Sequence, residues 1–319
     1  MTSEIKLRPN DRRNVRVVLL MVLLVAVVAW GYLGRSRPKV AGPVAPAVQN
    51  RTEIYKGTPI HVRTDVPYAY SKSLTAEELE LDLYIPDGAK KLPILIYLHG
   101  GGWLGGNKNG IGPKSLSLAA SGMIVASVNY RLRPVKTAPN SATDIAAAVA
   151  YLRKHADEIG GDGDRLVLVG HSSGAHLAAL TLCDARYLAP YPGAAAAIRG
   201  LVLLDGSAYH VPRMMESMRG WLFTEPFGTD SALWKEVSPY HFAINRAGLP
   251  PMLLVHAGED AIRQQAANDM AEATARGGGK SVLLSAPTKT HYTVDIDLGN
   301  PADPLTIAVM KFIRDVVGQ

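Results

Sequence analysis

Four short runs of this sequence are apolar at nearly every position: ILIYL, LVLVG, LVLL and MLLV. A strand that is apolar on both faces has to be covered by helices on both sides, which is typical of a parallel sheet. Between two of these runs, Ile145, Val149, Leu152 and Ile159 recur with the helical period. Strand and helix patterns alternate over residues 51–319, which predicts one α/β domain with a doubly wound, mostly parallel sheet.

The predicted elements are short and have clear boundaries. The expected strands are Leu79–Pro86, Pro93–His99, Met123–Tyr130, Arg165–Gly170, Gly200–Asp205, Pro251–His256 and Ser281–Ser285. Besides the helix around Ile145, the expected helices are Ala175–Leu182, Ala266–Ala275 and Leu305–Val317.

One long stretch interrupts this alternation. Residues 206–250 lie between two expected strands and hold several large apolar side chains, among them Trp221, Phe223 and Phe227. An insertion of this size between sheet strands is a candidate lid over a site. The three aromatic side chains either wall an acyl or aryl pocket or pack the insertion against the core.

The charge of the chain is concentrated at its N-terminus. Residues 1–39 hold eight basic and two acidic side chains, so they account for the whole formal net charge of +6. The rest of the chain is electrically balanced, which argues against a basic groove for nucleic acid. Cys183 is the single cysteine, so the chain forms no intramolecular disulfide and no cysteine zinc cluster.

An uncharged run, VVLLMVLLVAVVAWGYLG, occupies residues 17–34. A helix of this length rises about 27 Å, close to the roughly 30 Å of a bilayer core. We therefore expect a basic tail over residues 1–16, an uncleaved transmembrane anchor over residues 17–34 and a Pro/Ala-rich linker over residues 35–50. A signal peptide cleaved near Ala45-Pro46-Ala47 and a buried core helix are the alternatives.

The basic side chains around this run predict its orientation. Five precede it and three follow it closely. Lys and Arg are more frequent on the cytoplasmic side of a membrane helix. We therefore expect a single-pass protein with its N-terminus in the cytoplasm and its α/β domain outside the cytoplasm.

The motif Gly170-His171-Ser172-Ser173-Gly174 follows the run LVLV and opens a helical pattern. A nucleophilic serine needs a sharp strand-to-helix turn, and flanking glycines let neighbouring backbone approach without a clash. The motif alone is weak evidence, because a glycine turn with an idle serine has the same letters. Its place between a strand and a helix favours Ser172 as a nucleophile.

A second glycine-rich turn, His99-Gly100-Gly101-Gly102-Trp103, follows the run ILIYL. Consecutive glycines after a buried strand leave backbone N–H groups free to stabilise an oxyanion. The N–H of Ser173, next to the nucleophile, is the expected second donor. A phosphate-binding loop is the alternative, but the Walker lysine and the GxGxxG helix start are missing. Trp103, beside this turn, is a candidate to limit the depth of a pocket.

A catalytic serine also needs a histidine base and an acid that orients it. In the chain order nucleophile, acid, histidine, only His291 follows the last expected strand. Asp260 ends the strand and turn MLLVHAGED at the carboxyl edge of the sheet and is the expected acid. Glu259 is its rival, and Asp205, after an earlier strand, is a further alternative.

Taken in order, LELDLYIP, ILIYLHGGGW, VNYRL, GHSSGAHLAAL, PPMLLVHAGED and the late THY resemble the α/β-hydrolase esterases. More narrowly, residues 53–317 resemble the bacterial carboxylesterase and feruloyl-esterase-like (BD-FAE-like) group, which is related to kynurenine formamidase and to the hormone-sensitive-lipase branch. The resemblance implies that Ser172 is the nucleophile, Asp260 the acid and His291 the base. It also implies an oxyanion hole formed by Gly101, Gly102 and Ser173.

These observations predict a membrane-anchored serine hydrolase that cleaves carboxylic esters through a covalent acyl-enzyme. We expect a small-molecule ester substrate with a short acyl chain, no nucleic-acid partner, and no metal or organic cofactor. An arylformamidase-type amide hydrolase that uses the same residues is the alternative enzyme. A catalytically silent binding protein on the same fold is the alternative outside the enzymes.

Overall fold

The computed structural model describes residues 48–69, 79–132 and 138–319, all of which belong to the compact unit Ala45–Gln319. Nine strands in this part of the chain form one sheet. They are β1 (Gln49–Tyr55), β2 (Thr58–Pro67), β3 (Glu80–Pro86), β4 (Leu92–Leu98), β5 (Ile124–Val128), β6 (Gly161–His171), β7 (Ile198–Leu204), β8 (Met252–Ala257) and β9 (Ser281–Ala286).

The sheet has an antiparallel edge and a parallel centre. Its strand order is β1-β2-β3-β5-β4-β6-β7-β8-β9. The pairs β1–β2, β2–β3 and β3–β5 are antiparallel, and every pair from β5 through β4 to β9 is parallel. Because parallel strands run the same way, the carboxyl ends of β4, β6, β7 and β8 meet at one edge of the sheet.

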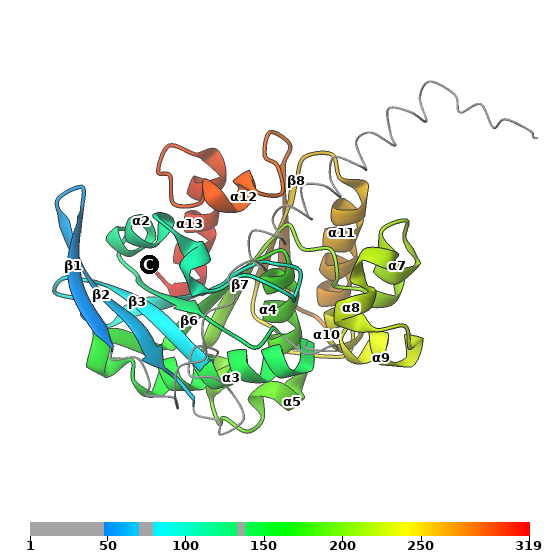
Figure 1. The fold of residues 1–319 in the computed structure, drawn as a ribbon, viewed down its shortest axis with the longest axis horizontal. Helices are drawn as coiled ribbons and strands as arrows, with labels where there is room; N and C mark the ends of the chain where they lie inside the picture. The colour runs from blue at the N-terminus through cyan, green and yellow to red at the C-terminus, as the bar shows by residue number, and fades with distance from the viewer. Residues whose placement is uncertain (1–47, 70–78, 133–137) are drawn as a thin grey trace, which may run out of the picture. The chain divides into compact units, whose positions relative to one another are not determined.

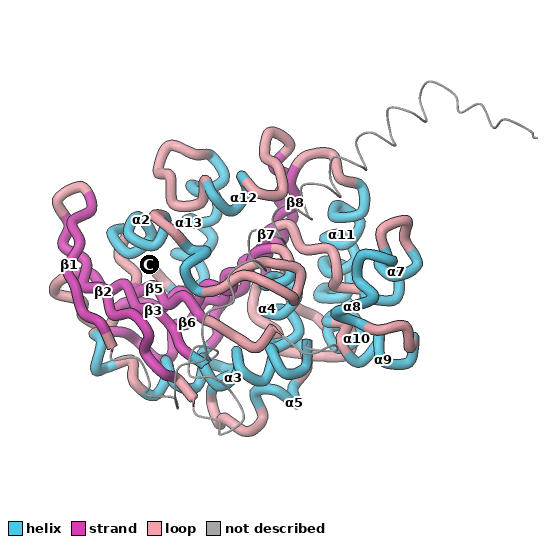
Figure 2. The backbone as a smooth tube through the Cα atoms, viewed as in Figure 1, coloured by secondary structure: helices cyan, strands magenta, loops and turns pink. Residues whose placement is uncertain are grey.

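Helices connect the strands and cover both faces of the sheet (Figures 1 and 2). The α-helices are α2 (Lys114–Ala120), α3 (Ala138–Lys154), α4 (Ser173–Cys183), α5 (Ala185–Leu188), α6 (Ala194–Ala197), α7 (Val211–Glu216), α8 (Thr224–Phe227), α9 (Ser231–Glu236), α10 (Pro239–Ala243), α11 (Ala261–Arg276), α12 (Thr293–Ile296) and α13 (Pro304–Val317). The 3-10 helices are η2 (Lys108–Ile111), η3 (Asp157–Ile159) and η4 (Gly220–Phe223).

The α/β architecture predicted from the sequence is confirmed, and each of the seven predicted strands and four predicted helices has its counterpart. The hairpin of β1 and β2 was not predicted. Most side chains of β1 are exposed, and only Ile60, Val62 and Val66 of β2 are buried. An edge hairpin with so little apolar pattern gives a weak sequence signal. β1 also includes Gln49 and Asn50, which were expected to lie in the linker.

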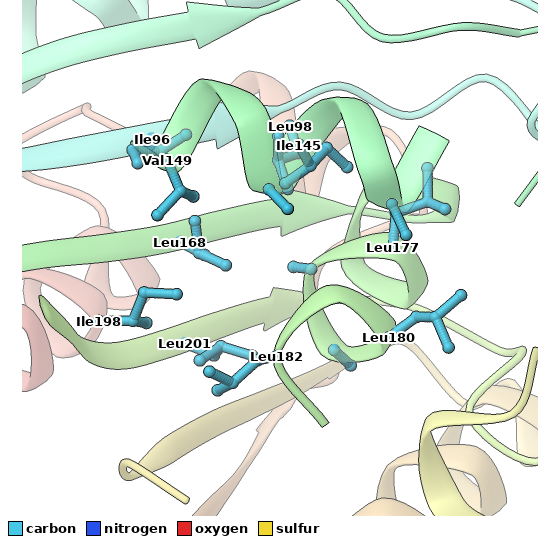
Figure 3. Close-up of a cluster of buried hydrophobic side chains, with 14 of the residues drawn as sticks. Ile96, Leu98, Ile145, Val149, Leu168, Leu177, Leu180, Leu182, Ile198 and Leu201 are labelled. Carbon is cyan, nitrogen blue, oxygen red and sulfur yellow. The ribbon is translucent and has the colours of Figure 1, made fainter. Parts of the chain in front are cut away.

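The core consists of two layers, one on each face of the sheet. Along β6, Leu166 and Leu168 belong to one buried cluster, whereas Val167 and Val169 belong to the other. Side chains of α3, α4 and α11 complete the first cluster, and side chains of α2 and α13 complete the second. Figure 3 shows the first cluster, where the central strands meet α3 and α4. This two-sided burial explains why the runs ILIYL, LVLV, LVLL and MLLV of the central strands are apolar at nearly every position.

The insertion between β7 and β8 folds into the short helices α7, η4, α8, α9 and α10. Ser238 joins two parts of it, because its hydroxyl accepts a hydrogen bond from Val211 N (2.9 Å) and donates one to Trp234 O (2.8 Å). Phe227 is buried, whereas Trp221 is 62% exposed. The insertion therefore has a packed inner side, and Trp221 lies on its outside.

Residues 17–34, predicted to span a membrane, lie outside the described residues. A spanning helix needs about 20 consecutive apolar residues. In the described ranges no helix is both long and apolar enough to cross a bilayer; the longest, α3, has 17 residues and carries Asp144, Arg153 and Lys154. The predicted location, a single-pass membrane protein with its catalytic domain outside the cytoplasm, is contradicted by this finding and is withdrawn.

The two-layer core predicts a contrast between two leucines in strands. Leu168 of β6 is fully buried, and Leu283 of the edge strand β9 is 45% exposed. Leu168→Ala should lower the free energy of unfolding by about 2–5 kcal/mol, because it leaves a cavity in close-packed surroundings. Leu283→Ala should change it by about 0.5 kcal/mol or less. Guanidinium titrations of both variants test this, and equal effects would contradict the assignment of the core.

Candidate active site

Ser172 occupies the turn between β6 and α4 in a conformation that side chains rarely adopt. Its φ is +54° and its ψ is −116°. Its N–H donates to Leu204 O at 2.9 Å, which ties the turn to the end of β7. A Cβ on Gly170 would lie 2.4 Å from Gly174 O, and one on Gly174 would lie 2.2 Å from Leu98 O. Both glycines of the motif are therefore required sterically, and the strained turn presents the serine at the sheet edge.

The glycine-rich turn after β4 lies directly against this serine. A Cβ on Gly100 would come within 3.2 Å of Ser172 Cβ and within 2.9 Å of His171 Nδ1. Gly101 and Gly102 follow with φ values of +134° and +63°. Among the backbone hydrogen bonds of turns, loops and caps in the described residues, none has the N–H of Gly101, Gly102 or Ser173 as its donor. Three free N–H donors thus lie in two neighbouring turns, as an oxyanion hole requires.

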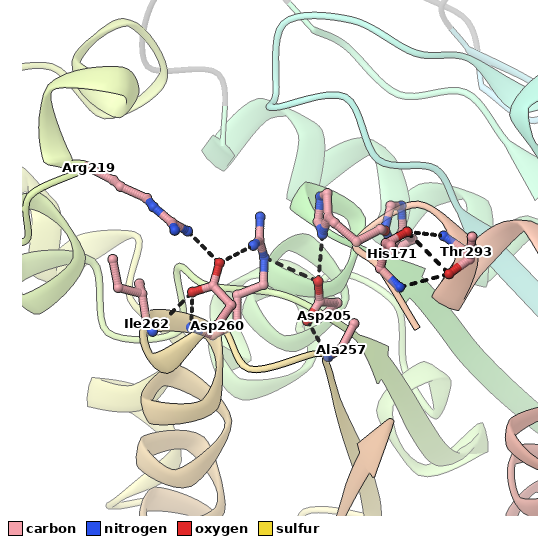
Figure 4. A network of polar contacts seen from close by, with 10 residues as sticks. His171, Asp205, Arg219, Ala257, Asp260, Ile262 and Thr293 are labelled. Carbon is pink, nitrogen blue, oxygen red and sulfur yellow. Dashed lines mark hydrogen bonds and ion pairs between the residues drawn. The ribbon is translucent and has the colours of Figure 1, made fainter. Parts of the chain in front are cut away.

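His291 lies in the turn between β9 and α12. Thr290 and Thr293 bracket this turn with reciprocal bonds, Thr290 N to Thr293 Oγ1 (2.8 Å) and Thr293 N to Thr290 Oγ1 (3.1 Å). The backbone oxygen of His291 accepts a hydrogen bond from His171 Nε2 at 2.7 Å, and Figure 4 shows His171 beside Thr293. His171 belongs to the serine turn, so this bond fixes the His291 turn next to Ser172. In the described residues no hydrogen bond joins His291 to Ser172 itself.

Asp205, at the end of β7, is the carboxylate that contacts His291. Its Oδ2 lies 2.6 Å from His291 Nδ1. Its Oδ1 accepts a hydrogen bond from Ala257 N at 2.7 Å, and the residue is 1% exposed. Arg263 approaches the same Oδ2, with Nε at 3.2 Å. A buried carboxylate held in this way orients the imidazole and leaves Nε2 free to face a reacting group.

Asp260, the acid expected from the sequence, has other partners (Figure 4). It is the N-cap of α11, where Oδ1 accepts hydrogen bonds from Ile262 N (3.1 Å) and Arg263 N (3.3 Å). Its Oδ2 pairs with Arg219 Nη1 (2.5 Å) and Arg263 Nη1 (2.6 Å). Both carboxylate oxygens are thereby occupied, and none of these partners is His291. The expected pairing of Asp260 with His291 is therefore corrected to Asp205, and Glu259 is exposed.

The charges around Asp260 also explain its protonation state. Burial raises the pKa of its carboxyl, but the hydrogen bond from Arg219 and the charges of Arg263 and Arg219 outweigh this effect. The pKa therefore lies below its ordinary value, and the group stays ionised at neutral pH. Asp260 thus acts as the centre of an ion-pair network beside the Asp205–His291 pair.

A buried polar cluster of Tyr97, Lys114 and Asp295 holds the helix that follows the His291 turn. Tyr97 OH of β4 donates to Asp295 Oδ1 of α12 at 2.9 Å, and Lys114 Nζ of α2 lies 2.7 Å from Asp295 Oδ2. Burial and the Asp295 charge raise the pKa of Tyr97 well above its ordinary value, so the phenol keeps the proton that it donates. This cluster connects α12, and with it the turn of His291, to the centre of the sheet.

Three of the four aromatic pocket candidates form a cluster rather than an open wall, whereas Trp221 is exposed. Trp103 packs edge-on against Phe227 (ring centroids 4.7 Å apart) and Phe223 (5.9 Å). Its Nε1 donates to His176 Nδ1 at 3.0 Å, so neutral His176 carries its proton on Nε2 and donates it to Val237 O at 2.7 Å. This chain of contacts attaches the insertion to the glycine-rich turn. His176 is fully buried at the centre of these contacts.

Solved structures with the same fold include esterases. The chain matches esterase B from Lactobacillus rhamnosis with a TM-score of 0.65, at 20% identity and with 98% of each chain covered. It matches esterase 2 from Thermogutta terrifontis with a TM-score of 0.60, at 23% identity and with 89% of this chain and 96% of that chain covered. The chain has the α/β-hydrolase fold.

Sequence comparison points to the same group of α/β-hydrolases. Residues 81–186 match the BD-FAE family model. Esterase LipQ from Mycobacterium tuberculosis is 27% identical over 80% of this chain and 63% of its own length. A probable isoprenylcysteine alpha-carbonyl methylesterase from Arabidopsis thaliana, ICMEL1, is 26% identical over 74% of this chain and 52% of its own length. The chain thus spans about half to two thirds of these relatives, and the resemblance to BD-FAE-like esterases is confirmed.

Three buried histidines of the site region predict a loss of stability in acid. Burial lowers the pKa values of His99, His171 and His176 from 6.5 to about 4. Between these pH values the unfolded chain binds protons that the folded chain does not, so the free energy of unfolding should fall as the pH drops from about 6.5 to 4.

The variant His176→Gln isolates the contribution of one of these histidines. It should reduce the slope of stability against pH in this window by up to about 1.4 kcal/mol per pH unit. Leu283→Ala, at an exposed side chain that does not titrate, is the control and should leave the slope unchanged. Guanidinium titrations at pH 7, 6 and 5 measure the free energy of unfolding, and its change with pH gives the slope. Identical slopes for wild type and His176→Gln would refute the prediction.

Proposed function

We propose that this α/β-hydrolase cleaves carboxylic esters, with Ser172 as nucleophile, His291 as base and Asp205 as the acid that orients it. The observation that carries this proposal is the 2.6 Å contact between His291 Nδ1 and Asp205 Oδ2, beside the strained turn of Ser172. The esterase names of the relatives LipQ and LipM support the class of reaction.

The first half of the reaction forms an acyl-enzyme. Ser172 Oγ attacks the acyl carbon of the ester while His291 Nε2 takes the serine proton. Asp205 stabilises the imidazolium that results, because its carboxylate lies against Nδ1. His291 then gives the proton to the departing alcohol oxygen, and the acyl group remains on Ser172.

Water completes the cycle. His291 takes a proton from a water molecule, which attacks the acyl carbon, and Ser172 recovers its proton when the carboxylic acid leaves. In both halves negative charge develops on the carbonyl oxygen. The free N–H groups of Gly101, Gly102 and Ser173 are the proposed donors to that oxygen, and each such donor is worth about 3 kcal/mol of transition-state stabilisation.

The two carboxylates give a decisive comparison. Asp205→Asn should lower kcat by about 10³- to 10⁴-fold, because the amide favours the wrong imidazole tautomer. Asp260→Asn removes an ion-pair partner but no contact with His291, so we expect a loss of about tenfold or less. Steady-state kinetics on p-nitrophenyl butyrate measure both, with Ser172→Ala as the inactive reference. A severe Asp260→Asn defect beside a mild Asp205→Asn defect would restore the sequence-based assignment.

We infer that the substrates are small esters with short acyl chains. The cluster of Trp103, Phe223 and Phe227 fills the space behind the glycine-rich turn, which supports a shallow acyl site. Among structures of the same fold, the Thermogutta esterase has a propionate-bound form, and the Lactobacillus esterase has a form inhibited by a tributyrin phosphonate. Both of those molecules carry short acyl groups.

Chain length provides the test of this inference. The value of kcat/KM should peak for p-nitrophenyl esters of short acids, because each longer chain has to displace packed aromatic side chains. Esters from two to sixteen acyl carbons cover the range. A profile that still rises at the longest soluble chains would contradict the short-acyl inference, and faster turnover of an aryl formamide than of any ester would favour an arylformamidase.

A further inference from the structure

A continuous series of opposite charges connects the insertion to the candidate triad (Figure 4). Arg219, in the insertion, pairs with Asp260 at 2.5 Å. Asp260 pairs with Arg263 at 2.6 Å, and Arg263 Nε lies 3.2 Å from Asp205 Oδ2. Asp205 Oδ2 is the same atom that contacts His291. Arg263 therefore lies between two carboxylates, of which one belongs to the candidate triad and the other holds the insertion.

Asp205 needs compensation for its burial. A carboxylate that is 1% exposed has lost its hydration, which favours its protonated form unless donors and cations replace the water. In the described structure it receives the Ala257 N–H, the His291 ring and the Arg263 guanidinium. Arg263 is the only permanently charged group among these three.

The contact between Arg263 and Asp205 acts through charge. Arg263 Nε is buried and makes no hydrogen bond to any described residue, so its N–H does not point along the 3.2 Å contact. The hydrogen bond of this side chain goes from Nη1 to Asp260 instead. Asp260 thus holds the guanidinium in place, and the positive charge acts on Asp205 from there.

We propose that Arg263 is a positioning residue of the triad: fixed by Asp260, it places a permanent positive charge beside the buried Asp205 and thereby limits how tightly the Asp205–His291 pair holds a proton. This proposal rests on the ester hydrolysis proposed above. Removing the cation strengthens proton binding at Asp205, because a buried carboxylate loses its counter-charge. It also strengthens proton binding at His291, because the neighbouring negative charge is no longer offset. Both changes raise the pH at which the base becomes active.

The other groups near His291 stay constant in this comparison. His171 and Tyr292 lie close to its ring, with centroids 4.8 Å and 5.6 Å away. His171 is neutral near pH 7, because burial lowers its pKa to about 4. Among the described residues, further charged groups around the His291 turn are Lys114, Asp295, Lys289, Asp297 and Asp303, which pair among themselves.

The test compares the pH profile of kcat/KM in wild type, Arg263→Gln and Arg263→Lys. For Arg263→Gln we expect the acid limb to move up by about one pH unit and kcat to fall by about tenfold, with little change in KM. Arg263→Lys retains the charge and should move the limb by less than half as much. If Arg263→Gln does not fold, the proposal is tested by the smaller upward shift of the acid limb in Arg263→Lys.

Two further arginines provide controls. Arg276 lies on the same helix α11 and forms an exposed pair with Glu272, so Arg276→Gln should leave the profile unchanged. Arg219 contacts Asp260 but not Asp205, so Arg219→Gln should shift the limb in the same direction by less than Arg263→Gln. An unmoved acid limb in Arg263→Gln, or a loss of kcat without a shift and without rescue by lysine, would overturn the proposal.

Histidine NMR separates this proposal from the proposed reaction. In protein labelled with ¹³C at histidine Cε1, the His291 signal is assigned by its loss in His291→Gln and titrated in wild type and Arg263→Gln. The pKa of His291 should be higher in the variant, whether or not the protein turns over an ester. Absence of ester hydrolysis and of fluorophosphonate labelling in wild type would refute the proposed reaction, whereas an unchanged His291 titration would refute the role of Arg263.

Discussion

Two segments of backbone cross at the sheet edge with no space for a side chain between them, and the arrangement of the site depends on this crossing. A Cβ on Gly174 would meet Leu98 O at 2.2 Å. The end of β4 can therefore reach the start of α4 only while residue 174 is glycine. This contact brings the free N–H groups of the glycine-rich turn beside Ser172. It also explains why a serine with a φ of +54° is tolerated, because the close-packed strands on both sides fix the turn between them.

Buried charge organises the second half of the site. Asp205 follows β7 and Asp260 lies between β8 and α11, so both are at the carboxyl edge of the sheet. Arg263 contacts both of them. Their roles differ because the oxygens of the two carboxylates have different partners. Asp260 uses its oxygens on the first turn of α11 and on two guanidinium groups, whereas Asp205 offers one oxygen to His291. A helix N-cap that is also ion-paired is strongly stabilised where it is, so it is poorly suited to a second partner.

The insertion is attached to the site through polar contacts as well as aromatic packing. His176 accepts from Trp103 and donates to Val237 O, which requires the neutral ring that burial favours. Arg219 supplies a second attachment through Asp260. The first contact reaches the glycine-rich turn, and the second reaches Asp260, which holds Arg263 beside Asp205. A movement of the insertion would thus alter both sides of the proposed reaction at once.

The amino-acid sequence by itself determined the α/β class, seven of the nine strands of the described sheet and the places of Ser172 and His291 in turns after strands. These features follow from local patterns: apolar period, glycine spacing and chain order. Local pattern failed for the edge hairpin of β1 and β2, because most side chains of β1 are exposed and only three of β2 are buried. It also failed for the membrane prediction from residues 17–34, which the described helices do not support. Only the tertiary structure decided which carboxylate meets His291. The choice between Asp205 and Asp260 depends on β7 lying between β6 and β8 and on two arginines that saturate Asp260, and such distances between remote segments leave no trace in the spacing of the chain.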